Sequence, residues 1–206
     1  MTGKKQNKKL KRFYNRVYQK GERKHYSSII FSGDRVPPAK EAVLKEISWK
    51  EKTVLDAGCG TGEMPHLIAK AGARRVLGID FSKAAIDVAK KTHKHPNLIF
   101  ENKDISKVRG KFDVIVSLGT IEHLNNPFAA LKKLKTMLNP QGHMIITCPN
   151  WTNPRGYILL TLYYLFRAKI TLVDINYLTP IEFENWGKKL KMKLSWRTVE
   201  QSWGHG

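Results

Sequence analysis

The chain has 206 residues, of which 41% are hydrophobic, which suits one domain with a substantial core. Its 37 lysines and arginines against 17 acids give a formal charge of +20. This charge favours nucleic acid, an anionic membrane or an acidic substrate as a partner, although it can also serve solubility alone. The two cysteines, Cys59 and Cys148, lie far apart without metal-ligand spacing. They exclude a disulfide scaffold and favour a reducing, cytoplasmic compartment.

Residues 1–34 are predicted to form a basic N-terminal extension with a helix. Its first 24 residues hold ten lysines or arginines and one acid, Glu22. From Leu10 onward, apolar side chains recur at helical spacing, which predicts the helix. The segment lacks the apolar core of a signal peptide, and the longest apolar run, 157–166, is about half a membrane span. We therefore predict no transmembrane segment.

Residues 35–206 alternate between strand and helix patterns. A short amphipathic helix is predicted over 39–47, after the break at Pro37 and Pro38. The later predicted strands are 53–57, 75–80, 97–102, 112–118, 142–148 and 194–199, and the helices between them are 63–71, 83–91, 127–138 and 180–190. This alternation predicts an α/β fold with a Rossmann-like, doubly wound, mostly parallel sheet and helices on both faces. Ligands of such sheets bind at the carboxyl ends of the strands.

A long insertion, 149–179, separates the fifth predicted strand from the last helix. It holds six aromatic residues. We interpret it as a helical cap over the ligand cleft, but an ordinary core helix would show the same apolar spacing.

The most informative stretch is 53–62, where an apolar run ends in an acid and glycines follow at alternate positions: Asp56, then Gly58, Gly60 and Gly62. A strand, glycine turn and helix of this kind let a ligand lie against bare backbone. A dinucleotide fingerprint would need its third glycine one position later, where Glu63 stands. A carboxylate at a helix N-terminus disfavours a pyrophosphate. The pattern therefore favours a nucleoside ligand with a positive group and no phosphate.

A second acid, Asp80, closes the second predicted strand, 18 residues after Gly62. A carboxylate at this place can accept hydrogen bonds from the two hydroxyls of a ribose. Alternatively it could cap the next helix, a role that Ser82 could already fill.

Residues 54–62 resemble motif I of class I S-adenosylmethionine-dependent methyltransferases, V-L-D-x-G-C-G-x-G, at every position. Residues 78–82 are similar to the family's ribose-binding strand end, and residues 102–105 to its adenine-binding step. Residues 117–124 are similar to its fourth-strand motif, and residues 142–148 to its fifth strand. The resemblance covers 35–150 well and 175–200 loosely. It implies the cofactor S-adenosyl-L-methionine and a methyltransferase activity. The family usually ends with an antiparallel seventh strand, which is missing here, displaced, or beyond the end of this sequence.

The resemblance also implies roles for individual residues. Asp56 and the glycine loop would face the methionine end of the cofactor, Asp80 the ribose, and Asp104 with Ile105 the adenine, although Asp104 could also be a solvated loop acid. The implied cofactor contacts are Asp56, Gly58, Cys59, Gly60, Gly62, Asp80, Phe81, Asp104, Ile105, Leu118 and Gly119.

The candidate catalytic residues, His123 and Glu122, follow the fourth predicted strand. A histidine suits proton removal from an acceptor with a high pKa, although His123 could instead be structural or contact the cofactor. In some quinone-precursor O-methyltransferases a Glu-His pair here helps bind a divalent cation. One pair supplies too few ligands, so we predict no metal. Cys148 is expected to be a small strand residue, because the Pro-Cys of RNA cytosine-5 methyltransferases is absent.

The leading hypothesis is methyl transfer to an O or C nucleophile, with N as a further option, on a small-molecule or lipid-like acceptor. The basic N-terminus and the apolar run could hold the protein at an anionic membrane surface. The alternative is an RNA or ribosomal-protein methyltransferase, which the charge favours. A third possibility is a cofactor-binding partner subunit without catalysis. Gly119-Thr120 in place of N-P-P-Y disfavours adenine and glutamine N-methyltransferases.

Overall fold

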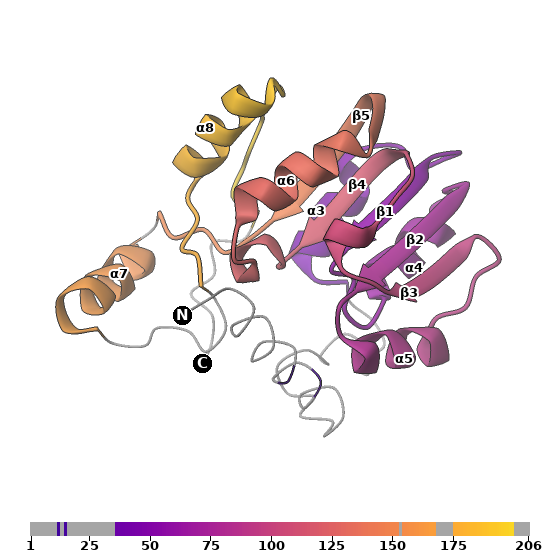
Figure 1. Ribbon diagram of the computed structural model, residues 1–206, viewed down its shortest axis with the longest axis horizontal. Coiled ribbons are helices and arrows are strands. Elements are labelled where there is room, and N and C mark those ends of the chain that lie inside the picture. Colours follow the sequence, from indigo (N-terminus) through magenta and orange to yellow (C-terminus); the bar gives the residue numbers. More distant parts are fainter. Residues whose placement is uncertain (1–11, 13–14, 16–35, 153, 168–174, 200–206) are drawn as a thin grey trace.

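The computed structural model describes residues 36–152, 154–167 and 175–199, together with Arg12 and Asn15. Within these residues, five parallel strands form one sheet in the order β3-β2-β1-β4-β5 (Figure 1). They are β1 (Thr53–Ala57), β2 (Arg75–Asp80), β3 (Leu98–Asn102), β4 (Phe112–Leu118) and β5 (Leu138–Thr147). The order reverses between β1 and β4, so the ligand crevice of such a sheet lies at their carboxyl ends.

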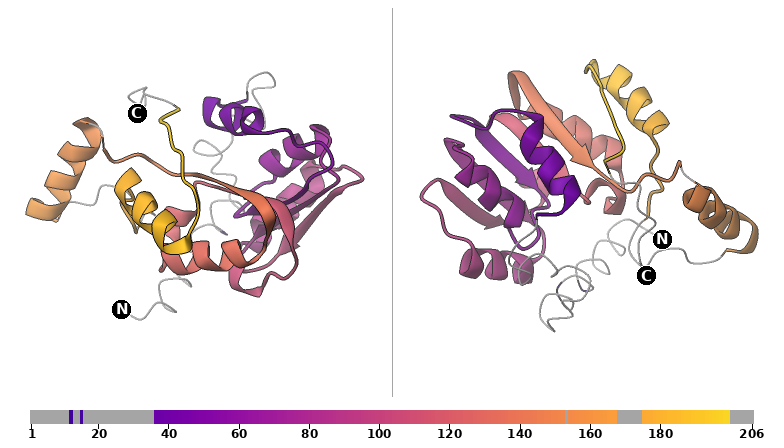
Figure 2. Two further views of the ribbon diagram at one scale, coloured as in Figure 1. Left: turned by 90° about the horizontal axis from the view of Figure 1, so that it is seen from above. Right: turned by 180° about the vertical axis from the view of Figure 1, so that it is seen from behind.

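Helices cover both faces of this sheet, which confirms the predicted Rossmann-like fold (Figure 2). One face carries α3 (Pro38–Glu46), α4 (Glu63–Lys70) and α5 (Lys83–Thr92), and the other carries α6 (Pro127–Thr136) and α8 (Pro180–Leu190) with the 3-10 turns η2 (Ile105–Lys107) and η3 (Ile121–His123). These bounds agree with the predicted helices to within two residues at each end.

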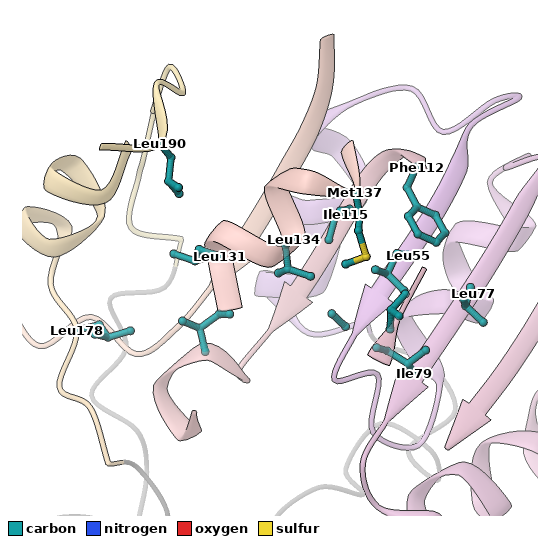
Figure 3. Close-up of a cluster of buried hydrophobic side chains, with 13 residues drawn as sticks. Leu55, Leu77, Ile79, Phe112, Ile115, Leu131, Leu134, Met137, Leu178 and Leu190 are labelled. Carbon is teal, nitrogen blue, oxygen red and sulfur yellow. The ribbon is translucent and has the colours of Figure 1, made fainter. Parts of the chain in front are cut away.

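The larger core lies between the sheet and α6 with α8. Alternation along β1 divides its side chains between the two faces: Leu55 and Ala57 point into this cluster, while Val54 points into the other. Leu131 and Leu134 of α6 cover the strands here (Figure 3). Leu178 and Leu190 extend the same cluster to α8, so the segment before α8 is tied to the core.

On the opposite face, the start of α4 packs tightly against β3. Gly62 has a φ of +90°, and a Cβ at this position would lie 2.6 Å from the ring of Phe100. Only glycine fits both the left-handed backbone and this contact. The packing therefore fixes where the glycine turn between β1 and α4 can lie.

The insertion 149–179 contains one described helix, α7 (Pro154–Phe166). It stands apart from the layers around the sheet in every view (Figures 1 and 2). Most of its large apolar side chains are exposed, Leu165 and Phe166 by 70% and 72%. That it caps a ligand cleft remains a prediction. No helix in the described part of the chain has the length and apolar character to cross a membrane.

The predicted sixth strand, 194–199, is wrong. These residues form no strand, and Leu194, Trp196 and Val199 are all exposed. The alternation of apolar residues suggested a half-buried strand, but in the described part of the chain these side chains do not pack into a core. The segment is instead held by polar contacts, such as that of Arg197 with Glu46 of α3 at 2.6 Å. The predicted extension over 1–34 lies outside the described residues except for Arg12 and Asn15, both helical.

Strand β5 begins four residues earlier than predicted, and α6 correspondingly ends at Thr136 instead of 138. The sequence Asn-Pro-Gln-Gly at 139–142 forms an irregularity within the strand, where the register against β4 shifts. Gln141 takes a φ of +62°, and the amide of Asn139 donates to Asp113 Oδ1 at 2.7 Å. These two features let the chain stay paired through the turn.

Candidate functional site

The glycine loop between β1 and α4 is held by backbone hydrogen bonds to the end of β2. The N–H groups of Gly58 and Cys59 both donate to the carbonyl of Ile79 at 2.9 Å. The side chain of Cys59 turns away into a hydrophobic cluster with Phe100, and burial raises the pKa of its thiol. Cys59 therefore shapes the loop through its backbone.

The same loop touches the turn that follows β4. Gly58 has a φ of +90°, and a Cβ there would lie 2.3 Å from Thr120 Oγ1. The hydroxyl of Thr120 donates to the carbonyl of Leu118 at 3.1 Å, and Gly119 N–H donates to Thr147 of β5 at 3.0 Å. The structure thus brings the predicted residues Leu118 and Gly119 beside the glycine loop.

Asp80 ties the glycine loop to β2 and α5. Its Oδ2 accepts from Gly60 N–H at 3.1 Å and its Oδ1 from Ser82 N–H at 2.7 Å. Burial raises the pKa of Asp80, while these two hydrogen bonds oppose the rise. A carboxylate has about four acceptor positions, so both oxygens can still accept from a ligand.

Ser82 resolves the alternative role for Asp80. Its Oγ accepts from Ala85 N–H at 3.3 Å and caps α5, so Asp80 is not the helix cap. The Ser82 hydroxyl also donates to Asn15 Oδ1 at 2.7 Å, which brings one N-terminal residue to this end of the sheet.

Asp56, at the end of β1, is buried with 2% of its surface exposed. Its Oδ1 has no hydrogen-bond partner among the described residues. Burial raises the pKa of Asp56 to about 7, against the effect of Lys40, while Asp80 and Glu63 add to the rise. A buried carboxyl with one oxygen left without a partner fits a ligand that brings a positive or hydrogen-bond-donating group, as the methionine part of S-adenosylmethionine does.

Lys40 of α3 is a charged residue of this site that the sequence pattern did not single out. Its Nζ lies 3.5 Å from Glu63 Oε2, and the Thr61 hydroxyl donates to Glu63 Oε1 at 2.8 Å. The carboxylate at the start of α4 is therefore paired. Nothing in the sequence distinguishes Lys40 from the other 36 lysines and arginines, because its role depends on how α3 packs against α4.

Asp104 and Ile105 lie just past β3, beside the end of β2. Asn102 donates to the carbonyl of Asp80 at 2.9 Å and connects the two strand ends. Asp104 is exposed and caps η2, with Oδ1 accepting from Ser106 N–H at 2.8 Å. Ile105 is half-buried, as is Phe81 at the end of β2. The fold places all three at the carboxyl edge, and their contact with a nucleoside stays a prediction.

The turn η3 carries the two candidate catalytic residues at the end of β4. Glu122 is buried with 2% exposed, and His123 is half-buried. No group of three or more His, Cys, Asp or Glu that could hold a metal ion occurs among the described residues. The turn also receives hydrogen bonds from Asn176, a residue that no sequence pattern distinguishes.

A family model described as "Methyltransferase domain" matches residues 7–191. The ubiquinone biosynthesis O-methyltransferase of Coxiella burnetii is 29% identical over 167 residues, which cover 77% of this chain and 70% of that protein.

Two solved structures are similar as well. An S-adenosylmethionine-dependent methyltransferase from Listeria monocytogenes superposes with a TM-score of 0.51 and 27% identity over 55% of each chain. Magnesium protoporphyrin IX methyltransferase from Synechocystis, with bound SAH, has a TM-score of 0.69 and 17% identity over 89% of this chain and 88% of its own. The second shows the shared fold alone. With its motif I loop, its sheet order and the match over residues 7–191, the chain belongs to the methyltransferase domain family.

Proposed function

We propose that this protein is an S-adenosylmethionine-dependent methyltransferase that methylates an oxygen or carbon nucleophile of a small-molecule or lipid-like acceptor. The observation that carries the proposal is Asp80, which fixes the glycine loop through Gly60 and keeps acceptor positions at the carboxyl edge of β2. An acid in this place suits the hydroxyls of a ribose. When bound, S-adenosylmethionine supplies an electrophilic methyl group on a sulfonium.

The residues of this chain bind and orient that group. Asp80 would accept hydrogen bonds from the ribose hydroxyls, Asp104 and Ile105 would contact the adenine, and Asp56 would face the positively charged methionine end. Lys40 lies near both Asp56 and Glu63 and limits the negative charge there. Positioning of this kind, together with exclusion of water, supplies much of the catalysis in a displacement reaction.

On the acceptor side, His123 is proposed as the base that takes the proton from a hydroxyl nucleophile. It lies in η3, just past the carboxyl end of β4, and Thr120 at the start of this turn contacts Gly58 of the glycine loop. The O-methyltransferase name of the Coxiella burnetii relative supports an oxygen nucleophile on a small molecule. It does not favour the RNA alternative.

Two measurements test this proposal in order. Titration calorimetry with S-adenosylmethionine and with NAD should show binding of the first alone, because the loop lacks the dinucleotide spacing. Transfer of labelled methyl groups is then measured on phenolic acceptors with and without an apolar tail, with total RNA as a parallel acceptor. Absence of S-adenosylmethionine binding, or methyl transfer to RNA but no phenol, would contradict the proposal.

A second proposal concerns contact with a membrane surface through α7. This helix carries no charged residue from 156 to 166, and most of its large apolar side chains are exposed. No acid occurs in the sequence between Glu122 and Asp174, while the same stretch contains several lysines and arginines. An exposed apolar helix within a cationic region suits the interface of an anionic bilayer.

Sedimentation with lipid vesicles tests this contact. We expect binding to vesicles that contain anionic lipid and much weaker binding to neutral vesicles. Leu165→Glu should abolish sedimentation, whereas Ile181→Glu, at a similarly exposed apolar position on α8, should not. Equal recovery of both variants with the vesicles would exclude α7 as the contact.

A further inference from the structure

We propose that Asn176 is a positioning residue that holds the catalytic turn η3 from the segment between α7 and α8. The inference rests on the proposed function, because it assigns Asn176 a role through Glu122 and His123. The residues come from distant parts of the chain, 54 positions apart between Asn176 and Glu122. Their contact is therefore a product of the tertiary fold.

The contact consists of a dense set of hydrogen bonds. The carbonyl of Glu122 accepts from Ile175 N–H at 3.2 Å, from Asn176 N–H at 3.1 Å and from the Asn176 side-chain amide at 3.0 Å. The same amide donates to the carbonyl of Leu124 at 2.7 Å. One side chain therefore bridges the carbonyls on either side of His123.

These carbonyls need partners from outside the turn. A 3-10 turn of three residues leaves its last carbonyl groups without partners within the turn. The carboxamide of asparagine has two N–H donors on one nitrogen, which matches two carbonyls a short distance apart. When both hydrogen bonds are made, the backbone on each side of His123 is fixed. The position of the His123 Cα, from which the side chain extends, is therefore fixed as well.

The segment that carries Asn176 is itself firmly anchored. Leu178, two residues on, is 5% exposed within the core cluster beneath α6. Thr179 then begins α8 with a capping box in which its N–H donates to Glu182 Oε2 at 2.7 Å. Asn176 thus transmits the position of α8 and the core to η3.

The neighbouring residue connects the segment to α7. The ring of Tyr177 lies 5.3 Å from that of Tyr163 on α7 and 4.9 Å from that of Trp151, which is 7% exposed. Asn176 and Tyr177 therefore join the insertion and the catalytic turn through adjacent side chains.

The test uses two variants of the full-length protein with a matched control. Asn176→Asp keeps the size but places a carboxylate against two carbonyl oxygens, and Asn176→Ala removes both donors. Asn139→Ala is the control, because the amide of Asn139 makes one hydrogen bond with Asp113, far from η3. Asn176→Gln, which retains the two donors on a longer side chain, tests for partial rescue.

The readouts are hydrogen exchange of the backbone over 120–124, the kcat and KM for the methyl acceptor, and the Kd for S-adenosylmethionine. We expect faster exchange in this segment and a kcat lower by about 10- to 100-fold in both variants, since small misplacements of a catalytic group have effects of this size. The Kd for S-adenosylmethionine should stay within about twofold, and Asn139→Ala should change none of these readouts.

Exchange over 120–124 does not depend on turnover, so it decides the inference even if the wild-type protein methylates no acceptor. In that case the proposed function fails while the role of Asn176 at the turn can still hold. Unchanged exchange in Asn176→Asp would overturn the inference. A loss of stability without a fall in kcat relative to KM, or without rescue by Asn176→Gln, would overturn it as well.

Discussion

Two aspartates on the neighbouring strands β4 and β1, Asp113 and Asp56, have pKa values shifted in opposite directions. Asp113 lies at the amino end of β4, where its carboxylate accepts from Thr53 N–H at 2.8 Å, from the Thr53 hydroxyl at 2.7 Å and from Asn139 at 2.7 Å. These hydrogen bonds, with the Thr53 backbone first, hold the pKa of Asp113 at about 2. The charge is satisfied by the protein itself and joins β1, β4 and β5.

Asp56 lies at the other end of β1, where the sheet opens toward the site. Burial raises its pKa to about 7, and its Oδ1 has no partner in the described part of the chain. A buried carboxyl of this kind destabilises the folded state whenever it is ionised. The contrast indicates that the amino edge of the sheet serves stability, while the carboxyl edge retains groups for a ligand.

The largest effect is expected from Asp80→Ala at the carboxyl edge. The variant loses the hydrogen bonds to Gly60 and Ser82 as well as those proposed to the ribose. The Kd for S-adenosylmethionine should rise by about 100-fold or more, because charge-assisted hydrogen bonds contribute about 1.5–3 kcal/mol each. Calorimetry measures the change, with Asp87→Ala on the exposed side of α5 as the control. A loss in the control as great as in Asp80→Ala would contradict this assignment.

At the amino edge, Asp113→Ala should lower the stability of the protein without changing its ligand site. We expect the free energy of unfolding in urea at pH 7 to fall by about 1–2 kcal/mol, since partly buried donors lose a charged acceptor. The native pKa lies below the unfolded value of 3.8, so this stabilisation is present above pH 3.8 and is lost as the pH falls through about 2. The Kd for S-adenosylmethionine should stay within about twofold. An unchanged free energy of unfolding in Asp113→Ala, together with weaker binding of S-adenosylmethionine, would contradict the assignment of stability to the amino edge and of ligand binding to the carboxyl edge.

The central strands and the helices between them were predictable because each follows from local pattern. Strands β1, β2 and β4 have the predicted bounds, since parallel strands buried on both faces show continuous apolar runs. The acid at the end of such a run, with glycines after it, also placed Asp56 and Asp80 at the same edge of the sheet.

The features that could not be predicted from the sequence depend on contacts with distant parts of the chain. The alternation over 194–199 fits a strand, but this segment does not pair with the edge strand β5, and its apolar side chains remain exposed. Lys40 reaches the site because α3 packs against α4. Asn176 reaches it from a segment that lies more than 50 residues from Glu122 in the sequence. Their residue types carry no local pattern that separates them from other lysines and asparagines.

Asp56→Asn should change stability in the direction opposite to Asp113→Ala. Because burial raises the pKa of Asp56, its contribution to stability is fully present below pH 3.8 and is lost as the pH rises through about 7. The neutral amide avoids this loss, so the variant should be more stable than the wild type at pH 8 in urea unfolding. Its Kd for S-adenosylmethionine should rise by about 10-fold, since a favourable charge is removed. Reduced stability at pH 8 would show that Asp56 is satisfied within the protein, as Asp113 is.

The smallest effect, proton release on cofactor binding, separates the two aspartates most directly. A positive ligand group beside Asp56 favours the ionised carboxylate, so binding should expel the proton that the free protein carries. With a pKa of about 7, this amounts to about half a proton at pH 7 and almost none at pH 9. Calorimetry in buffers of different ionisation enthalpy measures the number. Asp56→Asn should abolish the release while Asp113→Ala leaves it unchanged, and a release that persists in Asp56→Asn would assign the proton to another group, such as Asp80, whose pKa burial also raises.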